Sequence, residues 1–348
     1  MGCGGAVAPY VAHHSGRLNV LTSASAPSHF DLAALDLATL DLAILGADAP
    51  LADAFLAILE EREIPLRRLY ALTFGEEESS ATFQGMDWPY EDATAFDYRK
   101  AHALVVMGQD AAARRLLAKI RSEQPHLPIL DVNDTDALID PAPAQVAARL
   151  LRPINALAGL VSAEAFVTLP VALAGKAGID ELAEQTRSLF NMQTPESEVF
   201  PLQIAFNLLP VAQAVGPLDY ESRLAQATMR LSNGLAVGFT AATGSLFFGA
   251  VMALHVRTEQ VLDIEKLRHA LQHKAGITLM EADLPAAMPS PATDAQGSQD
   301  VFVGRIRVDG NAGRFWLVFD PIALEAAQVV TWLESLKVEN TRRSNDQD

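Results

Sequence analysis

Few residues in this chain are of a type and spacing that could do chemistry. Cys3 is the only cysteine, and it lies in a glycine- and alanine-rich stretch ahead of any predicted strand. A nucleophilic thiolate needs a base or a helix N-terminus beside it, so we do not expect Cys3 to be one. His269 and His273 are four residues apart on a predicted helix, a spacing that can bind zinc. No acidic or cysteine third ligand accompanies them, so a solvated helix face is favoured and no metal site is expected.

Two further features are typical of ligand-binding sites in α/β proteins. Asp131, Asp134 and Asp136 follow a predicted strand, where ligands often bind, but helix-capping aspartates explain them equally well. Gly46-Ala47 lies between a predicted strand and helix, where a glycine-rich turn could hold a phosphate. A single glycine is weak support for a nucleotide site, and a plain strand-to-helix turn is favoured.

Composition narrows the class of protein. The 348 residues carry a formal net charge of −17, which repels nucleic acid and anionic lipid, so neither is expected as a partner. Half of the residues are hydrophobic, enough for a sizeable core. No apolar run approaches the roughly 20 residues of a spanning helix, and the start does not resemble a secretory signal. A single cysteine fits a reducing compartment, so we expect a cytoplasmic protein.

Hydrophobic periodicity predicts two domains. In the first half, buried strands alternate with amphipathic helices, as in a doubly wound parallel sheet. The predicted strands there are 40–45, 69–74, 103–107 and 129–132, with an exposed extended segment over 83–90 and helices over 51–63 and 110–123. The second half mixes the two types, which favours an α+β domain. Its predicted strands are 166–171, 234–240, 247–256, 301–308 and 314–319, its helices 144–158, 180–190, 220–231, 264–273 and 324–336, and its long loop 281–298. Pro153 predicts a kink or break in the helix that contains it. His255 lies on a predicted strand among apolar residues, which favours a core histidine.

Several motifs, in order, resemble the aspartate-semialdehyde dehydrogenases, NADP-dependent enzymes that reduce aspartyl phosphate. The similarity runs from about Leu42 to Leu336, and the nearest subgroup is the Usg proteins, bacterial paralogues of this dehydrogenase. The segments that carry it are 55–65, 83–85, 151–160, 199–210 and 300–309. The resemblance implies a Rossmann-like sheet and an α+β dimerisation domain of the semialdehyde dehydrogenase type. We therefore expect a flexible tail over 1–37, a vestigial nucleotide-binding domain over 38–142 completed by helix 322–337, a dimerisation domain over 143–321 and a frayed end over 338–348.

The resemblance also implies a catalytic set, and its positions fall on residues that cannot do the chemistry. The family's nucleophilic cysteine falls on Ala142 and its glutamine on Leu169. Its substrate arginine and base histidine, seven residues apart, fall on Thr243 and Ala250. Without a thiolate there is no thioacyl intermediate, so we expect no retained catalytic residue.

The positions at which the family binds its cofactor and substrate also lack most of the expected residues. The family's glycine-rich phosphate turn falls on the stretch that begins at Gly46 and Ala47, and its 2′-phosphate segment falls near the three glutamates 76–78. On the helix that carries a substrate lysine and glutamate, Arg223 keeps a charge but Ala227 does not. We expect no cofactor, and treat Arg223 as a relic.

The sequence therefore favours a homodimeric family member without dehydrogenase chemistry, with an interaction or regulatory role and an unknown protein partner. An NAD(P)-dependent oxidoreductase acting on a semialdehyde in amino-acid biosynthesis, with NADP as its cofactor, is the alternative. A small-molecule sensor that uses the vestigial cleft is a third.

Overall fold

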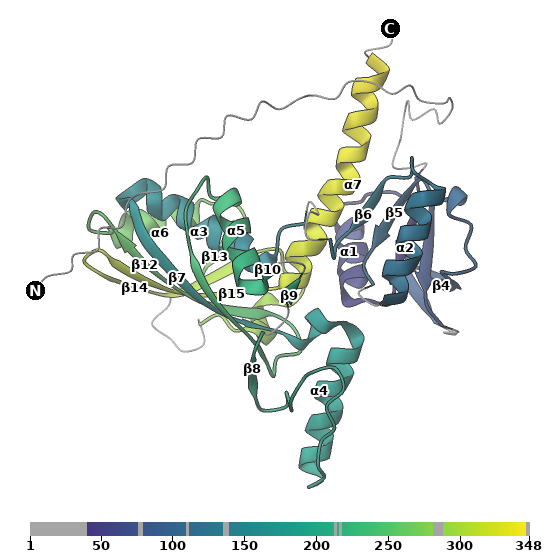
Figure 1. Ribbon diagram of the computed structural model, residues 1–348. Coiled ribbons are helices and arrows are strands. Elements are labelled where there is room, and N and C mark those ends of the chain that lie inside the picture. The colour runs from purple at the N-terminus through teal and green to yellow at the C-terminus, as the bar shows by residue number, and fades with distance from the viewer. Residues whose placement is uncertain are drawn as a thin grey trace, which may run out of the picture.

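The structure is a computed structural model, which describes residues 40–75, 79–108, 111–134, 139–211, 214–215, 218–280 and 288–345. The predicted N-terminal tail, the glutamates 76–78 and Asp136 lie outside these residues. Two sheets, each with its own helices, form two domains, and α7 passes between them (Figure 1).

The first domain is built on a six-stranded sheet, in the order β3-β4-β2-β1-β5-β6. Its strands are β1 (Asp41–Leu45), β2 (Arg68–Thr73), β3 (Ser80–Phe83), β4 (Met86–Asp92), β5 (Ala103–Val106) and β6 (Ile129–Asp131). All neighbours are parallel except β3 and β4, which form an antiparallel hairpin at the edge. The helical elements are α1 (Pro50–Glu61), the 3₁₀ turn η2 (Tyr98–Lys100) and α2 (Ala111–Glu123). The expected doubly wound α/β fold is confirmed.

Both faces of the central strands are covered, which explains the unbroken apolar runs of β1 and β5. In β1, Leu42 and Ile44 pack with α1 and α7, whereas Ala43 and Leu45 pack with α2. The two residues of each pair are two positions apart, so their side chains point to the same face of the pleated strand.

The second domain is built on a seven-stranded, mostly antiparallel sheet, in the order β13-β14-β15-β12-β7-β11-β8. Its strands are β7 (Leu160–Leu169), β8 (Leu208–Pro210), β11 (Gly238–Gly244), β12 (Ala250–Thr258), β13 (Ile277–Leu279), β14 (Val301–Asp309) and β15 (Ala312–Phe319), beside a small hairpin of β9 (Ala214–Val215) and β10 (Leu218–Asp219). The helical elements are α3 (Ala142–Ala158), η3 (Val171–Ala174), α4 (Gly175–Phe190), α5 (Tyr220–Leu231), α6 (Ile264–Gln272) and the turn η5 (Pro291–Ala295). This is the expected α+β arrangement.

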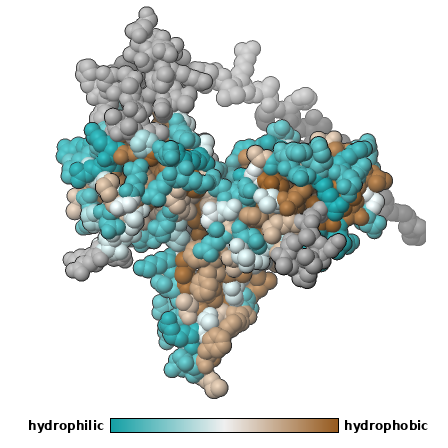
Figure 2. All heavy atoms as spheres, turned by 180° about the vertical axis from the view of Figure 1, so that it is seen from behind, coloured by the Kyte–Doolittle hydropathy of each residue, from teal (hydrophilic) through white to brown (hydrophobic). Residues whose placement is uncertain are grey.

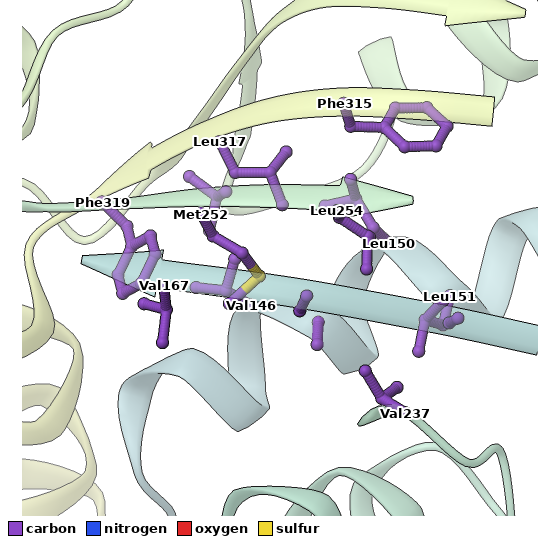
Figure 3. Close-up of a cluster of buried hydrophobic side chains, with 14 of the residues drawn as sticks. Val146, Leu150, Leu151, Val167, Val237, Met252, Leu254, Phe315, Leu317 and Phe319 are labelled. Atoms are coloured by element: carbon purple, nitrogen blue, oxygen red, sulfur yellow. The ribbon is translucent and has the colours of Figure 1, made fainter. Parts of the chain in front are cut away.

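One face of this sheet packs on helices and forms the larger core (Figure 3). Val146 and Leu150 of α3 lie against Val167 of β7 and Met252 of β12. Among the described residues, the opposite face carries no helix as long as α3, α5 or α6. Near β14 and β15 it meets the segment 289–295, and Trp316 Nε1 donates to the Pro289 carbonyl oxygen at 3.2 Å.

Helix α7 (Pro321–Asn345) joins the two domains. Leu324 near its start belongs to the core of the second domain, whereas Ala326, Val329 and Leu333 belong to the core of the first. Residue 325 therefore lies on a helix at the point where it leaves one core for the other.

An arm made of α4 and the segment 191–207 projects from the second domain (Figure 1). Its fold depends on two polar side chains of α4. Buried Gln185 accepts the backbone N–H groups of Ile204 and Ala205 at 2.8 and 3.0 Å. The Glu181 carboxylate accepts the N–H of Glu198 at 2.9 Å. These bonds fold the returning segment back onto α4.

The structure departs from the sequence predictions at several points. Helix α3 continues through Pro153 without a break. The predicted strand 234–240 lies at 238–244, and α7 extends beyond residue 337, through the part of the chain where we expected fraying. The predicted long loop 281–298 contains the helical turn η5. The sequence also favoured a core position for His255, which is wrong, because this side chain is exposed on the open face of β12.

Gly46 offers a test of the turn after β1. Its φ is +84°, and a Cβ there would lie 2.3 Å from the backbone nitrogen of Gly108. We expect Gly46→Ala to lower the free energy of unfolding by about 2 kcal/mol or more, through backbone strain and this clash. Gly85, with φ +68° and nothing within 4 Å of a built Cβ, is the matched control. Urea unfolding should show a clearly smaller loss for Gly85→Ala, and equal losses would contradict the clash.

Candidate functional site

The candidate site lies where α3 begins, between the two domains. Pro141, the residue before the helix, has no side-chain hydrogen bond to the first turn. The backbone N–H of Ala142 instead donates to Oε1 of Glu325, on α7, at 3.0 Å. The start of a helix in the second domain is thus capped by a carboxylate from the helix that the two domains share.

The residue pair just before α3 is held from two sides. Gln328 of α7 accepts the Asp140 N–H at 2.8 Å and donates to the Asp140 carbonyl oxygen at 2.9 Å. The Asp140 carboxylate forms an ion pair with Arg230 of α5. Glu325, Gln328 and Arg230 therefore fix the segment 140–142 to both neighbouring helices.

Several ionisable groups influence the charge of Glu325. Burial raises the pKa of Glu325 to about 7, against the opposing effects of the Ala142 N–H and of the Arg223 charge. The nearby Asp320 carboxylate adds to the rise. Burial, and then the charge of Glu325, also raises the pKa of Tyr220, which lies on α5 one turn from Arg223. Tyr220, Arg223, Asp320 and Glu325 thus form one electrostatic cluster.

Within that cluster Asp320 has an ordinary structural role. Its carboxylate accepts the N–H groups of Ile322 and Ala323, at 2.9 and 3.3 Å, and so caps its own helix α7. It also accepts the Gly297 N–H at 2.7 Å. Burial nevertheless outweighs these bonds and raises the pKa of Asp320.

The positions at which the sequence placed the family's chemistry are brought together in the structure. Ala142, Leu169 and Ala250 are buried members of the same apolar core, at 0, 4 and 0% exposure. Thr243 lies beside Leu169 in the parallel register of β11 and β7. Arg223, the charged relic, lies on α5, where its charge lowers the pKa of Glu325 and where Ala227 is buried. The region is lined by apolar side chains and by the cluster around Glu325.

The turn after β1 uses its donors internally. The N–H groups of Gly46 and Ala47 both bond to the Leu72 carbonyl oxygen, at 2.9 and 3.2 Å, and the Ala49 N–H bonds to the Gly46 oxygen at 3.1 Å. Asp48 is close enough to Asp53 for its charge to add to the desolvation that raises the pKa of Asp53. Occupied donors and two carboxylates are the opposite of what a pyrophosphate needs, so the turn does not fit the phosphates of NADP.

The other candidates from the sequence lie apart from this site. His269 and His273 pack edge to face at the end of α6, with ring centroids 4.5 Å apart. Asp131 accepts the Asn133 N–H at 3.0 Å, and Asp134 lies 3.7 Å from Arg121. Across the part of the chain that the structure describes, no group of three or more potential ligand side chains could hold a metal ion. In the same residues, no helix is both long and apolar enough to cross a bilayer.

Sequence reasoning missed Glu325. The signal was present, because Glu325 lies three residues after Ile322 and four before Val329, within the buried stripe of α7. A carboxylate in an apolar helical stripe needs a partner. That partner is the backbone of a helix 183 residues earlier in the chain, which a local pattern cannot reveal.

The comparisons with known proteins all return semialdehyde dehydrogenases or USG-1 homologues. Residues 151–322 match the family described as "Semialdehyde dehydrogenase, dimerisation domain". A "USG-1 protein homolog" from Azotobacter vinelandii is 28% identical over 324 residues, which cover 83% of this chain and 96% of that protein. The crystal structure of aspartate semialdehyde dehydrogenase II from Vibrio cholerae, described as complexed with ASA, superposes with a TM-score of 0.72 at 26% identity, covering 85% of this chain and 98% of the other.

A more distant structure shares the fold alone. The aspartate semialdehyde dehydrogenase from Candida albicans, described as a structure with NADP, is 12% identical, with a TM-score of 0.55 over 88% of this chain and 99% of the other. Cofactor binding is thus seen on this fold, in a protein of low similarity.

Proposed function

We propose that this chain is a cytoplasmic, homodimeric member of the aspartate-semialdehyde dehydrogenase family that has lost dehydrogenase chemistry and has an interaction or regulatory role. The observation that carries the proposal is the start of α3. There Ala142, which stands at the expected nucleophile position, has a buried methyl group and an N–H that is already bonded to Glu325. Alanine offers no nucleophile and no acid–base group.

Two further observations support the loss. Leu169 and Ala250, which stand where a glutamine and a histidine are expected, are packed in the apolar core and offer no polar atom beyond their backbone. The donors of the turn at Gly46 and Ala47 are bonded within the protein. No cofactor is therefore proposed to bind, and Arg223 is proposed as a substrate relic whose charge now lowers the pKa of Glu325.

The domain organisation is part of the proposal. A Rossmann-like domain over 38–142, completed by the helix over 322–337, would serve as scaffold, and the domain over 143–321 would form the dimer. The match of residues 151–322 to a dimerisation domain supports this division.

The alternative function is an active NAD(P)-dependent oxidoreductase acting on a semialdehyde in amino-acid biosynthesis. Its basis is the similarity over most of the chain to proteins named aspartate-semialdehyde dehydrogenase. It requires a thiolate or an equivalent nucleophile at the start of α3, and the residue there is Ala142.

The decisive experiment is an assay with aspartate semialdehyde, phosphate and NADP, run on the wild type and on Ala142→Cys. We expect neither to form NADPH above background, because the thiol would return without its glutamine, arginine and histidine partners. Calorimetric titration with NADP should give no saturable binding at micromolar concentrations. Turnover by the wild type would overturn the proposal, and turnover by Ala142→Cys alone would show that only the nucleophile had been lost.

A further inference from the structure

Basic side chains gather at one end of the sheet face that lies opposite α3, α5 and α6. Arg307 on β14 is directly opposite Arg314 on β15, and Arg314 is directly opposite His255 on β12. All three side chains are exposed, and their neighbours along each strand belong to the core. Arg257, two residues after His255, is exposed on the same face. We call these four residues the basic patch.

The ion pairs within the chain leave the basic patch out. Like charges directly opposite each other in a sheet are destabilising, yet neither Arg307 nor Arg314 forms an ion pair among the described residues. Glu164, in the same row on β7, leans away from them, since its carboxylate fills the space that a Cβ at Gly238 would need. Asp309 is opposite Ala312, at the end of the hairpin. A carboxylate from elsewhere would relieve the repulsion within this row.

The arm carries the opposite charge. Residues 175–207 contain five carboxylates and only two basic side chains. Glu184 is paired with Arg187 on α4. Glu196 and Glu198, on the segment that returns along α4, are exposed, and neither is in an ion pair in the part of the chain that the structure describes. The returning segment therefore offers the negative charge that would neutralise the basic patch.

Within one subunit, the arm and the basic patch lie at opposite ends of the sheet. The arm leads into β8, where Leu208 pairs with Gly244, next to the end of β7 at Leu169. The row of the basic patch crosses β7 at Glu164, five residues earlier, which is about 16 Å away. The arm projects beyond the β8 end, away from the patch (Figure 1). A two-fold axis that runs across the strands would bring the arm end of one subunit to the patch end of its partner.

We propose that the arm of each subunit lies on the basic patch of a second copy of this chain, with the carboxylates of Glu196 and Glu198 beside its arginines. This inference rests on the proposed homodimer and gives that dimer an orientation, in which the strands of the two facing sheets run in opposite directions. The apolar part of the face, around Phe166, lies between the two charged ends. Apolar contacts there supply most of the affinity, and the charged ends fix the orientation.

Charge-swapped variants of the full-length chain test this arrangement. The patch variant carries Arg307→Glu and Arg314→Glu, and the arm variant carries Glu196→Lys and Glu198→Lys. Each variant alone should dimerise about tenfold or more weakly than the wild type, because like charges meet at both ends of its dimer. An equimolar mixture should form heterodimers within about threefold of the wild-type dissociation constant, since opposite charges meet again at both ends. Analytical ultracentrifugation measures the constants, and native mass spectrometry identifies the heterodimer.

The matched control is the double variant Arg114→Glu and Arg115→Glu. It makes the same change in net charge as the patch variant, but on exposed residues of α2 in the first domain, and it should dimerise as the wild type does. A chain that carries the patch and the arm substitutions together should also recover the wild-type dissociation constant. That chain keeps the test valid if one charge-reversed pair alone impairs folding.

The outcomes separate this inference from the proposed function. The inference is overturned if the patch variant or the arm variant dimerises as tightly as the wild type, or if their mixture forms no heterodimer. A dimer that persists unchanged in both variants would leave the proposed homodimer in place and remove only its orientation. Turnover of aspartate semialdehyde by the wild type would instead overturn the proposed function, whatever the charge-swapped variants show.

Discussion

Replacement of Phe166 or Phe206 by aspartate should convert a dimer of this protein into monomers. Both side chains are exposed in the single chain, at 41 and 68%, so the change should leave the fold of each subunit intact. A carboxylate buried at a subunit interface without a partner costs several kcal/mol. We expect dimer dissociation constants to rise at least a hundredfold, measured by analytical ultracentrifugation over a concentration series.

The surface that carries this prediction is the face of the seven-stranded sheet opposite α3, α5 and α6. Phe166 on β7 lies opposite Ala253 on β12, and Ala253 lies opposite Trp316 on β15. Val251, two residues before Ala253, continues the apolar face and lines a shallow hollow together with Phe206 and Trp316. Sheets of this kind need one buried face, and a second apolar face is typical of an interface.

The arm extends this face. Figure 2 shows hydrophobic residues gathered along the protruding part of the second domain. Among them Phe190 and Phe206 contact each other edge to face, with ring centroids 6.0 Å apart, and both are exposed. A surface that continues from the sheet onto an arm can meet its own copy about a two-fold axis, as in isologous dimers.

The control is Met86→Asp. Met86 is 52% exposed, but it lies on β4 in the first domain, away from the open sheet face. We expect this variant to remain dimeric. A wild type that is monomeric at micromolar concentration would refute the homodimer, and a Met86→Asp variant that dissociates as fully as Phe166→Asp would move the interface to the first domain.

Much of the fold followed from local pattern. Periodicity alone predicted the buried strands 40–45 and 103–107 and the amphipathic helix 220–231. The structure has strands and a helix there. The wrong predictions concern features that tertiary contacts determine. Pro153 is tolerated inside α3. The exposure of His255 depends on which face of β12 packs against the helices, and the alternating pattern of a single strand does not show which face that is.

The candidate site was predictable only in part. Sequence comparison placed Ala142, Leu169 and Ala250 together, and they share a core. It could not place Glu325 or Gln328, because their partners are backbone groups at 140–142 in another part of the chain. A side chain that bonds to a distant backbone group leaves no pattern of charge or spacing in the sequence from which its partner could be predicted.

Glu325 gives the second prediction, in which stability depends on pH. The ordinary pKa of glutamate, 4.5, applies to the unfolded chain, and burial raises the pKa to about 7 in the folded protein. Between these values the folded state binds the extra proton, so this group's contribution to stability is fully present below pH 4.5 and is lost as the pH rises through 7. The loss is on the order of 3 kcal/mol, from about 1.4 kcal/mol per pKa unit.

Glu325→Gln should remove this loss. The amide keeps an oxygen that can accept the Ala142 N–H but cannot ionise. The variant should therefore resemble the wild type near pH 5 and be more stable at pH 8, by about 2 to 3 kcal/mol. Urea unfolding at both pH values and at one protein concentration measures the difference, and the fixed concentration keeps any dimerisation effect constant.

The comparison with wild type isolates Glu325 from the other carboxylates whose pKa is raised. Asp53 and Asp320 also lose stability as the pH rises, but they are present in both proteins and cancel in the difference. Glu334→Gln, on the exposed side of the same helix, should change stability by less than about 0.5 kcal/mol at either pH. If Glu325→Gln were less stable than the wild type at pH 8, the carboxylate would be a net stabilising cap in its ionised form. Glu325 would then hold the start of α3 to α7 by its charge near neutral pH.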